Sequence, residues 1–184
     1  MSQAADLNEM VVESVRVHML SSQHVVILRD TARERYLPIW IGPWEANAIA
    51  TKLQGVTPER PMTHDLFSDT LNELGVTVKQ IIVADLAEDT FRARLVLEVD
   101  GRSVELDARP SDAIALAVRA GVPIFATDAV MDRAAVTPET SEDQSLEVFR
   151  EFINSLNIDL PGEGPEGPEG PDEPEEREER RRLD

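Results

Sequence analysis

The stretch RSVELDARPSDAIALAVRAGVP, residues 102–123, contains a strand, a sharp join and a helix, and it decides the fold. Polar and apolar residues alternate from Ser103 to Ala108, which predicts a strand with one buried face. Pro110 suits the first position of a helix because its missing N–H needs no partner there, and Gly121 predicts the end of that helix. The apolar residues between them predict a helix that is mostly buried.

Polar residues gather at the start of this helix, and they are the first candidates for a functional site. They are Asp107, Arg109, Ser111 and Asp112. A carboxylate in the first turn offsets the positive end of a helix, so Asp112 also has a purely structural explanation.

A second strand-to-helix join precedes the first in the chain. The apolar residues 37–41 lead into Pro43 and Glu45, which are spaced as Pro110 and Asp112 are. The two joins form either a pseudo-repeat or two independent, well-capped helices, and the sequence leaves both interpretations open.

A third helix is predicted from Thr63 to a stop at Gly75, with Arg60 shortly before it. His64 and Asp65 lie in its first turn. They are either an acid favoured at a helix start beside an exposed imidazole, or a general base with an orienting neighbour. The stripe predicted to be buried comprises Leu66, Phe67, Thr70, Leu71 and Leu74.

Asp100-Gly101 is a strong signal for a two-residue hairpin turn between strands 91–99 and 102–108. A turn of two residues fixes which residues face each other. The expected core-side pairs are Leu97 with Val104, Leu95 with Leu106 and Ala93 with Ala108, and the expected outer pairs are Arg94 with Asp107 and Arg92 with Arg109. Two opposed arginines are unfavourable unless an anion lies between them, so either a carboxylate of the protein or a bound phosphate is expected there.

The remaining elements complete an α+β fold, in which helices pack against a mixed, largely antiparallel sheet. Three short strands at 10–20, 25–28 and 36–41 predict an antiparallel meander, on which Val11, Val15 and Val17 share the buried face while His18 and His24 are strand-face residues rather than ligands. Residues 122–126 predict a strand added in parallel, and 142–156 predict an amphipathic helix. We expect a flexible leader at 1–9, one domain at 10–157, and a disordered acidic tail rich in Pro, Gly and Glu at 158–184.

Charge and composition restrict the function. The chain has 184 residues and a net charge of −18, and residues 161–184 carry −6 of it, which leaves −12 on residues 1–160. Such a protein repels polyanions at long range, so nucleic-acid binding requires a local basic patch or a metal ion. The absence of cysteine fits a cytoplasmic protein, and no apolar run approaches the roughly 20 residues of a membrane span.

Three blocks of the sequence resemble the bifunctional nuclease domain family. They are Leu37–Gly42 followed by Glu45-Ala46, Arg60–Leu66, and Asp107–Ala117. The resemblance covers roughly residues 10–156 and does not extend to the acidic tail. It implies a compact α+β domain, oligomeric in some members and with nuclease activity on RNA and DNA in certain members.

A nuclease of this kind would hydrolyse phosphodiester bonds, most economically with Mg²⁺ or Mn²⁺ held by the oxygen ligands Glu45, Asp107 and Asp112. His64, oriented by Asp65, is the candidate general base, and Asp112 is also a candidate catalytic acid. Arg109 or Arg60 would hold the scissile phosphate, with Arg92, Arg94 and Ser111 as further substrate-binding candidates. The alternative is a non-enzymatic module that binds a small anion or a protein partner. A third option is a structural oligomer that associates through exposed strand edges and the last helix, and a homo-oligomer is expected.

Overall fold

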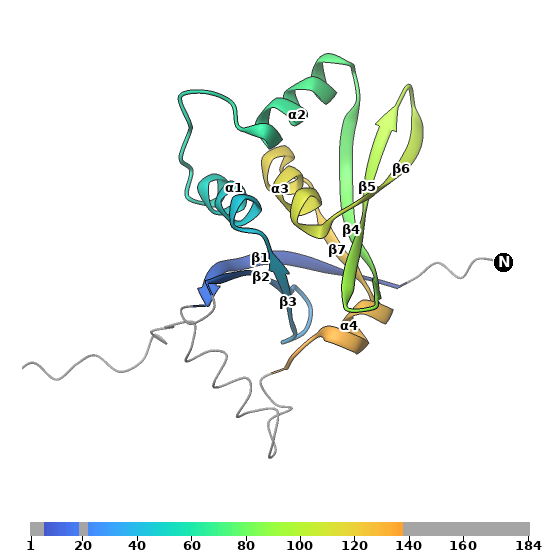
Figure 1. The fold of residues 1–184 in the computed structure, drawn as a ribbon. Helices are drawn as coiled ribbons and strands as arrows, with labels where there is room; N and C mark the ends of the chain where they lie inside the picture. The colour runs from blue at the N-terminus through green and yellow to red at the C-terminus, as the bar shows by residue number, and fades with distance from the viewer. Residues whose placement is uncertain (1–5, 19–21, 138–184) are drawn as a thin grey trace, which may run out of the picture.

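The computed structural model describes residues 6–18 and 22–137, and these form one seven-stranded sheet with four helices (Figure 1). The strands are β1 (Leu7–His18), β2 (Gln23–Asp30), β3 (Tyr36–Ile41), β4 (Thr77–Ala87), β5 (Thr90–Val99), β6 (Arg102–Ala108) and β7 (Ile124–Thr127). The helices are α1 (Pro43–Leu53), α2 (Thr63–Glu73), α3 (Pro110–Ala120) and α4 (Asp128–Ala134).

The sheet has the order β3-β2-β1-β7-β4-β5-β6. Neighbouring strands are antiparallel except β4 and β7, which are parallel because the chain crosses over through α3. The predicted α+β class, the mixed and mostly antiparallel sheet, and the meander of the first three strands are therefore confirmed. The short β7 lies in the middle, between β1 and β4, and joins two three-stranded meanders.

Helix α3 is the centre of the packing. It begins at Pro110, ends at Gly121 in the left-handed conformation (φ 66°), and packs against β4 and β5 between α1 and α2. Five consecutive residues, Ala113–Ala117, are buried, and three of them are alanine. Small side chains allow neighbouring elements to approach the helix closely, so α3 fixes where the other two helices begin.

The β5–β6 register is the predicted one, with Asp100 and Gly101 both at positive φ in the turn. The burial expected for β6 is wrong, because Val104 and Leu106 are 37% and 43% exposed. Strand β6 is at the edge of the sheet, beyond the strands that α3 covers. Helix α2 shows the same discrepancy: only Leu71 of its predicted stripe is buried, and its other apolar residues face solvent.

Strand β1 begins at Leu7, three residues earlier than predicted, because residues 7–10 pair with β7. Its buried face also differs from the prediction. The register shifts between Val12 and Ser14. Met10 and Val12 face the core before the shift and Val15 packs against the core after it, as predicted for Val15, while Val11 and Val17 are exposed. The predicted helix at 142–156 and the predicted tail at 158–184 lie outside the described residues. Within residues 6–18 and 22–137, no helix is long and apolar enough to cross a membrane.

Candidate functional site

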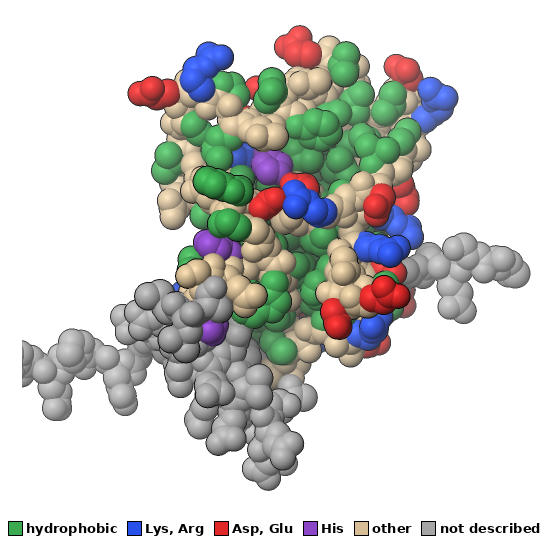
Figure 2. Space-filling model, in the orientation of Figure 1, with side chains coloured by type: hydrophobic (Ala, Val, Ile, Leu, Met, Phe, Trp, Pro, Cys, Tyr) green, Lys and Arg blue, Asp and Glu red, His purple; other side chains and the backbone are tan. Residues whose placement is uncertain are grey.

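Three helices begin close together on one side of the molecule, and each contributes a polar side chain from its first turn. Helix α1 contributes Glu45, α2 contributes His64, and α3 contributes Asp112. Figure 2 shows this side of the molecule, with histidine, acidic and basic side chains in the middle of the face beside hydrophobic surface. The nuclease hypothesis required these three helix starts to converge, and they do. Three helix N-termini, each with a positive partial charge, therefore lie near one point.

Arg109 is the hub of the cluster. Its Nε donates to Asp112 Oδ2 at 2.7 Å, and its Nη2 donates to Asp112 Oδ1 at 3.1 Å and to Glu45 Oε1 at 2.7 Å. The hydrogen bonds to Asp112 and Glu45 raise the pKa of the guanidinium. Nη1 has no hydrogen-bond partner within the described residues, and the side chain is 66% exposed. A positioned guanidinium with one free amino group can bind a phosphate oxygen.

His64 is oriented by Asp112 and not by its neighbour in sequence. His64 Nε2 lies 3.1 Å from Asp112 Oδ1, although the two residues are 48 positions apart. Burial by itself would raise the pKa of Asp112, but the hydrogen bonds from Arg109 and His64 outweigh it and lower that pKa. The carboxylate therefore stays ionised and accepts the Nε2–H. In the neutral ring this leaves Nδ1 as the nitrogen without a proton, and Nδ1 has no hydrogen-bond partner within the described residues.

Asp65 has a structural position instead of the predicted orienting role. Its Oδ2 accepts the backbone N–H of Met62 at 2.9 Å, and its Oδ1 accepts from Arg119 Nε at 2.7 Å. Burial would raise the pKa of Asp65, but the Met62 N–H and Arg119 lower it overall. Arg119 is only 5% exposed and also donates to the carbonyl oxygens of Ala115 and Ala48. This ion pair ties α2 to α3 and α1, so Asp65 positions His64 through the helix.

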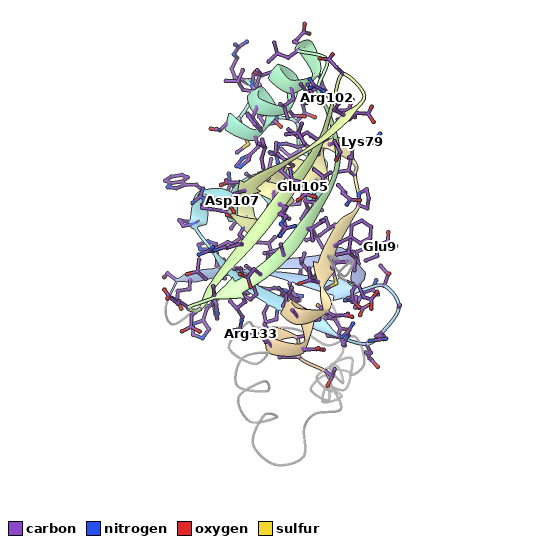
Figure 3. All side chains as sticks on the ribbon, turned by 90° about the vertical axis from the view of Figure 1, so that its right-hand side faces the viewer. Glu9, Lys79, Arg102, Glu105, Asp107 and Arg133 are labelled. Atoms are coloured by element: carbon purple, nitrogen blue, oxygen red, sulfur yellow. The ribbon has the colours of Figure 1, made fainter. Side chains whose placement is uncertain are left out.

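Asp107 does not join Glu45 and Asp112. On β6, residues 103, 105 and 107 face away from the side that carries Leu106 and the helices, and Figure 3 shows Glu105 and Asp107 on this outer face. The predicted tether to Arg94 is also absent: Arg94 pairs with Glu105 at 3.3 Å, although it is opposite Asp107 in register.

The opposed pair of Arg92 and Arg109 does not form either. Strand β6 ends at Ala108, so Arg109 turns toward Glu45 and Asp112, while Arg92 is paired in register with Asp85 of β4. Carboxylates of the protein neutralise Arg109, as one of the two alternatives proposed, whereas Arg92 makes no ion pair within the described residues. Arg92 and Arg94 are exposed on the outer face, away from the cluster.

The other two substrate-binding candidates differ in position. Arg60 is exposed in the loop between α1 and α2, and it lines neither cavity described below. Ser111 is 6% exposed and lies in the wall of the first cavity, where only a small part of its surface is reachable.

The carboxylates of the cluster do not fit a divalent cation as they stand. Glu45 Oε1 and both oxygens of Asp112 accept hydrogen bonds from the Arg109 guanidinium, which occupies the position that a cation would take. Among the described residues, no group of three or more His, Cys, Asp or Glu side chains is arranged to hold a metal ion.

Two cavities meet at Arg109. The first, of about 510 Å³, lies between the β2–β3 strands, the β4–β5 turn and the start of α3, and it is lined in part by Trp40, Phe91 and Arg109. The second, of about 480 Å³, lies between α1 and α2 and is lined in part by Trp44, His64 and Arg109. Sequence reasoning selected neither tryptophan, although both lie in the block around Gly42-Pro43 and are the only two in the chain.

Comparison with known sequences agrees with this architecture. The sequence profile of the bifunctional nuclease domain matches residues 26–139. Uncharacterized protein Rv1829 of Mycobacterium tuberculosis is 41% identical over 162 residues, which cover 83% of this chain and 97% of that protein. Bifunctional nuclease 1 and Bifunctional nuclease 2 of Oryza sativa subsp. japonica are 25% and 29% identical over 114 and 106 residues. These segments cover 60% and 55% of this chain but only 34% and 33% of the plant proteins. The chain belongs to the bifunctional nuclease domain family.

Proposed function

We propose that the protein is a cytoplasmic nuclease that hydrolyses phosphodiester bonds in RNA or DNA at the cluster of Arg109, Asp112 and His64. The observation that carries the proposal is the double anchoring of Arg109 by Glu45 and Asp112, together with Asp112 Oδ1, which contacts both Arg109 Nη2 and His64 Nε2 and so holds a guanidinium and an imidazole on one carboxylate. Membership of the bifunctional nuclease domain family supports the same class of substrate.

In the proposed reaction Arg109 binds a non-bridging phosphate oxygen and stabilises the charge that develops on it. His64 Nδ1 removes a proton from the attacking water, whose oxygen forms the new bond to phosphorus. The bond to the leaving ribose or deoxyribose oxygen breaks, and the imidazolium or solvent returns a proton to that oxygen. Asp112 fixes the tautomer of His64 and stabilises the imidazolium, as the carboxylate of a hydrolytic triad does.

The test is cleavage of end-labelled single-stranded RNA and DNA by the full chain. We expect His64→Ala to lower the rate about 10²- to 10⁴-fold, and Arg109→Ala to lower it about 10²- to 10³-fold. Arg29→Ala is the matched control, because Arg29 is another partly exposed arginine paired with a carboxylate, Glu13, and it lines neither cavity. Equal rates for wild type, His64→Ala and Arg109→Ala would contradict the proposal and identify a contaminating nuclease.

Metal dependence, which the sequence suggested, stays a prediction with a separate test. The observed carboxylates are engaged by Arg109, so a divalent ion would have to displace this side chain or bind with the substrate. Cleavage that is abolished by EDTA and restored by Mg²⁺ or Mn²⁺ would support a metal-assisted reaction. Unchanged cleavage in EDTA would support the mechanism by Arg109 and His64 alone.

A non-enzymatic module that binds a small anion or a protein partner is the second candidate. The charge of the cluster favours this second function. With neutral His64, the one positive charge of Arg109 and the two negative charges of Glu45 and Asp112 sum to −1, and a cluster of this charge attracts a polyanion poorly. Isothermal titration at low salt separates the two functions. Binding of inorganic phosphate without binding of an oligonucleotide would favour the module.

We also propose that the protein forms a homo-oligomer. The support is apolar surface on two neighbouring parts of one face, α2 and the outer strand β6 (Figure 2), where Leu66, Leu74 and Leu106 are 61%, 72% and 43% exposed. Size-exclusion chromatography with light scattering measures the mass directly. We expect Leu106→Lys to lower the mass, and a monomeric wild type would contradict the proposal.

A further inference from the structure

Each of the two tryptophans lines one of the two cavities that meet at Arg109. Trp40, near the end of β3, lines the first cavity and is 49% exposed. Trp44, in the first turn of α1, lines the second and is 82% exposed. The turn at Gly42-Pro43 separates them, and Arg109 lines both cavities. The strand-to-helix join therefore places one tryptophan in each of the two cavities that Arg109 lines.

Neither tryptophan is a core residue. A buried tryptophan contributes a large apolar area to a core, but Trp40 and Trp44 are 49% and 82% exposed. The ring of Trp40 contacts the ring of His18 edge to face, with the centroids 6.4 Å apart, and this contact leaves about half of Trp40 exposed. The chain has only 4% aromatic residues, so two exposed tryptophans beside one arginine are a concentration of the residue type that stacks on planar ligands.

Because the protein is acidic, binding of a nucleic acid at this cluster requires contacts that do not depend on charge. With neutral His64 the cluster carries −1, and residues 1–160 carry −12, so phosphate attraction alone cannot hold a nucleic acid here. Stacking of a base on an aromatic ring has little dependence on salt and is available to every base, but the base must be out of a duplex to offer its face.

We propose that Trp40 and Trp44 stack the two bases that flank the phosphodiester held by Arg109. The ligand class is therefore a single-stranded nucleic acid of at least two nucleotides. This inference rests on the proposed function, because it takes the scissile phosphate to be at Arg109. It adds two binding residues, Trp40 for the base on one side and Trp44 for the base on the other.

The experiment uses the intrinsic fluorescence of the full chain, because Trp40→Phe leaves Trp44 as the single reporter and Trp44→Phe leaves Trp40. The probes are a phosphorothioate oligothymidylate, which resists cleavage, and an abasic strand of the same length, which keeps the phosphates but has no bases. We expect the oligothymidylate to quench the remaining tryptophan in each variant, and the abasic strand to leave both unchanged. Equal quenching by the two strands would overturn the inference.

Affinity provides the second measurement. We expect Trp40→Ala and Trp44→Ala each to weaken oligothymidylate binding roughly tenfold or more, while the two phenylalanine variants bind nearly as well as wild type. Because few phosphates are neutralised, the slope of log Kd against log salt should be about one or less. Leu53→Ala is the matched control, since Leu53 is also 49% exposed, is on the same helix as Trp44 and lines neither cavity.

The outcomes separate this inference from the proposed function. Cleavage that depends on His64, with unchanged oligonucleotide affinity in both alanine variants, would overturn the stacking sites and leave the nuclease standing. Base-dependent quenching without any cleavage would leave the stacking sites standing and overturn the nuclease. No binding by wild type at low salt would overturn both.

Discussion

At the scale of a single residue, Gly42 controls the position of the arginine. A Cβ on Gly42 would lie 2.3 Å from Glu45 Oε2, so the glutamate side chain occupies the space that any other residue would need. Gly42 has a φ of −72°, which every residue can adopt, so the requirement for glycine is steric and concerns Glu45 alone. Glu45 is 15% exposed and holds one of the two Arg109 contacts, and its displacement would release that side of the guanidinium.

We therefore expect Gly42→Ala to lower nuclease activity about tenfold while changing the free energy of unfolding by less than about 1 kcal/mol. Steady-state cleavage and urea unfolding measure the two effects separately. Glu45→Gln is the companion variant, because it keeps the size of the side chain and one acceptor for Arg109 but removes the charge. A Gly42→Ala protein with normal activity would show that the Glu45 contact does not position Arg109.

At the scale of an element, the ion pair of Asp65 with Arg119 determines where α2 begins. Arg119 extends from α3 and is held by Asp65 and by two carbonyl oxygens, one of them in α1. Arg119 thus ties together the three helices that carry Glu45, His64 and Asp112, through Asp65 in α2 and Ala48 in α1. Removing Asp65 would leave a buried guanidinium without its carboxylate, which is costly.

Asp65→Ala should lower the free energy of unfolding by about 2 kcal/mol and reduce activity through the displacement of His64. Asp65→Asn keeps an acceptor for the Met62 N–H and should lose less of both. If Asp65 instead took part in proton transfer, Asp65→Asn would lose activity while keeping the wild-type free energy of unfolding. Measuring both activity and the free energy of unfolding of this variant therefore distinguishes the two roles.

At the scale of the whole molecule, a second buried ion pair connects the ends of the described chain. Asp30, 2% exposed, accepts from the backbone N–H groups of Ala32 and Arg33 and from Arg35 at 2.7 Å. Arg35 also donates to Asn8 Oδ1 at 2.6 Å, and Asn8 donates to Asp128 at 2.7 Å. Burial would raise the pKa of Asp30, but these hydrogen bonds lower it overall from the ordinary 3.8.

The lowered pKa values of Asp30, Asp65 and Asp112 predict the response to acid. A carboxyl group whose pKa is lower in the folded protein than in the unfolded chain stabilises the fold when the pH is above its pKa in the unfolded chain. This stabilisation is lost as the pH falls through its pKa in the folded protein. We expect stability that changes little above about pH 5 and falls steeply below about pH 4. Asp30→Asn should cost about 3 kcal/mol at pH 7 and make the acid limb shallower, as measured by urea unfolding across pH. Asp69→Asn, at an exposed position on α2, is the control and should stay within about 0.5 kcal/mol of wild type.

The sequence predicted local geometry better than contacts between distant residues. The Asp100-Gly101 turn, the helix starts at Pro43 and Pro110 and the stop at Gly121 were readable because each depends on backbone preferences of a few residues. The partner of His64 could not be predicted in this way. Asp65 and Asp112 are both acids in the first turn of a helix, and only the packing of α2 on α3 determines which of them contacts His64. Val104 and Leu106 were expected in the core and are not. The alternation of polar and apolar residues shows which side chains share a face of a strand, but it does not show whether a helix covers that face.

The place of β7 in the sheet has a consequence for the order of events during synthesis. Strands β1 to β3 and β4 to β6 can each pair locally as they leave the ribosome. Within the described sheet, the two sets are joined by the four residues of β7 near position 125. Until this segment has emerged, the nascent chain holds two separate halves with unpaired inner edges, and such edges invite mispairing with other chains. We expect protection by chaperones to matter most in this interval, and a chain truncated before Ile124 to aggregate.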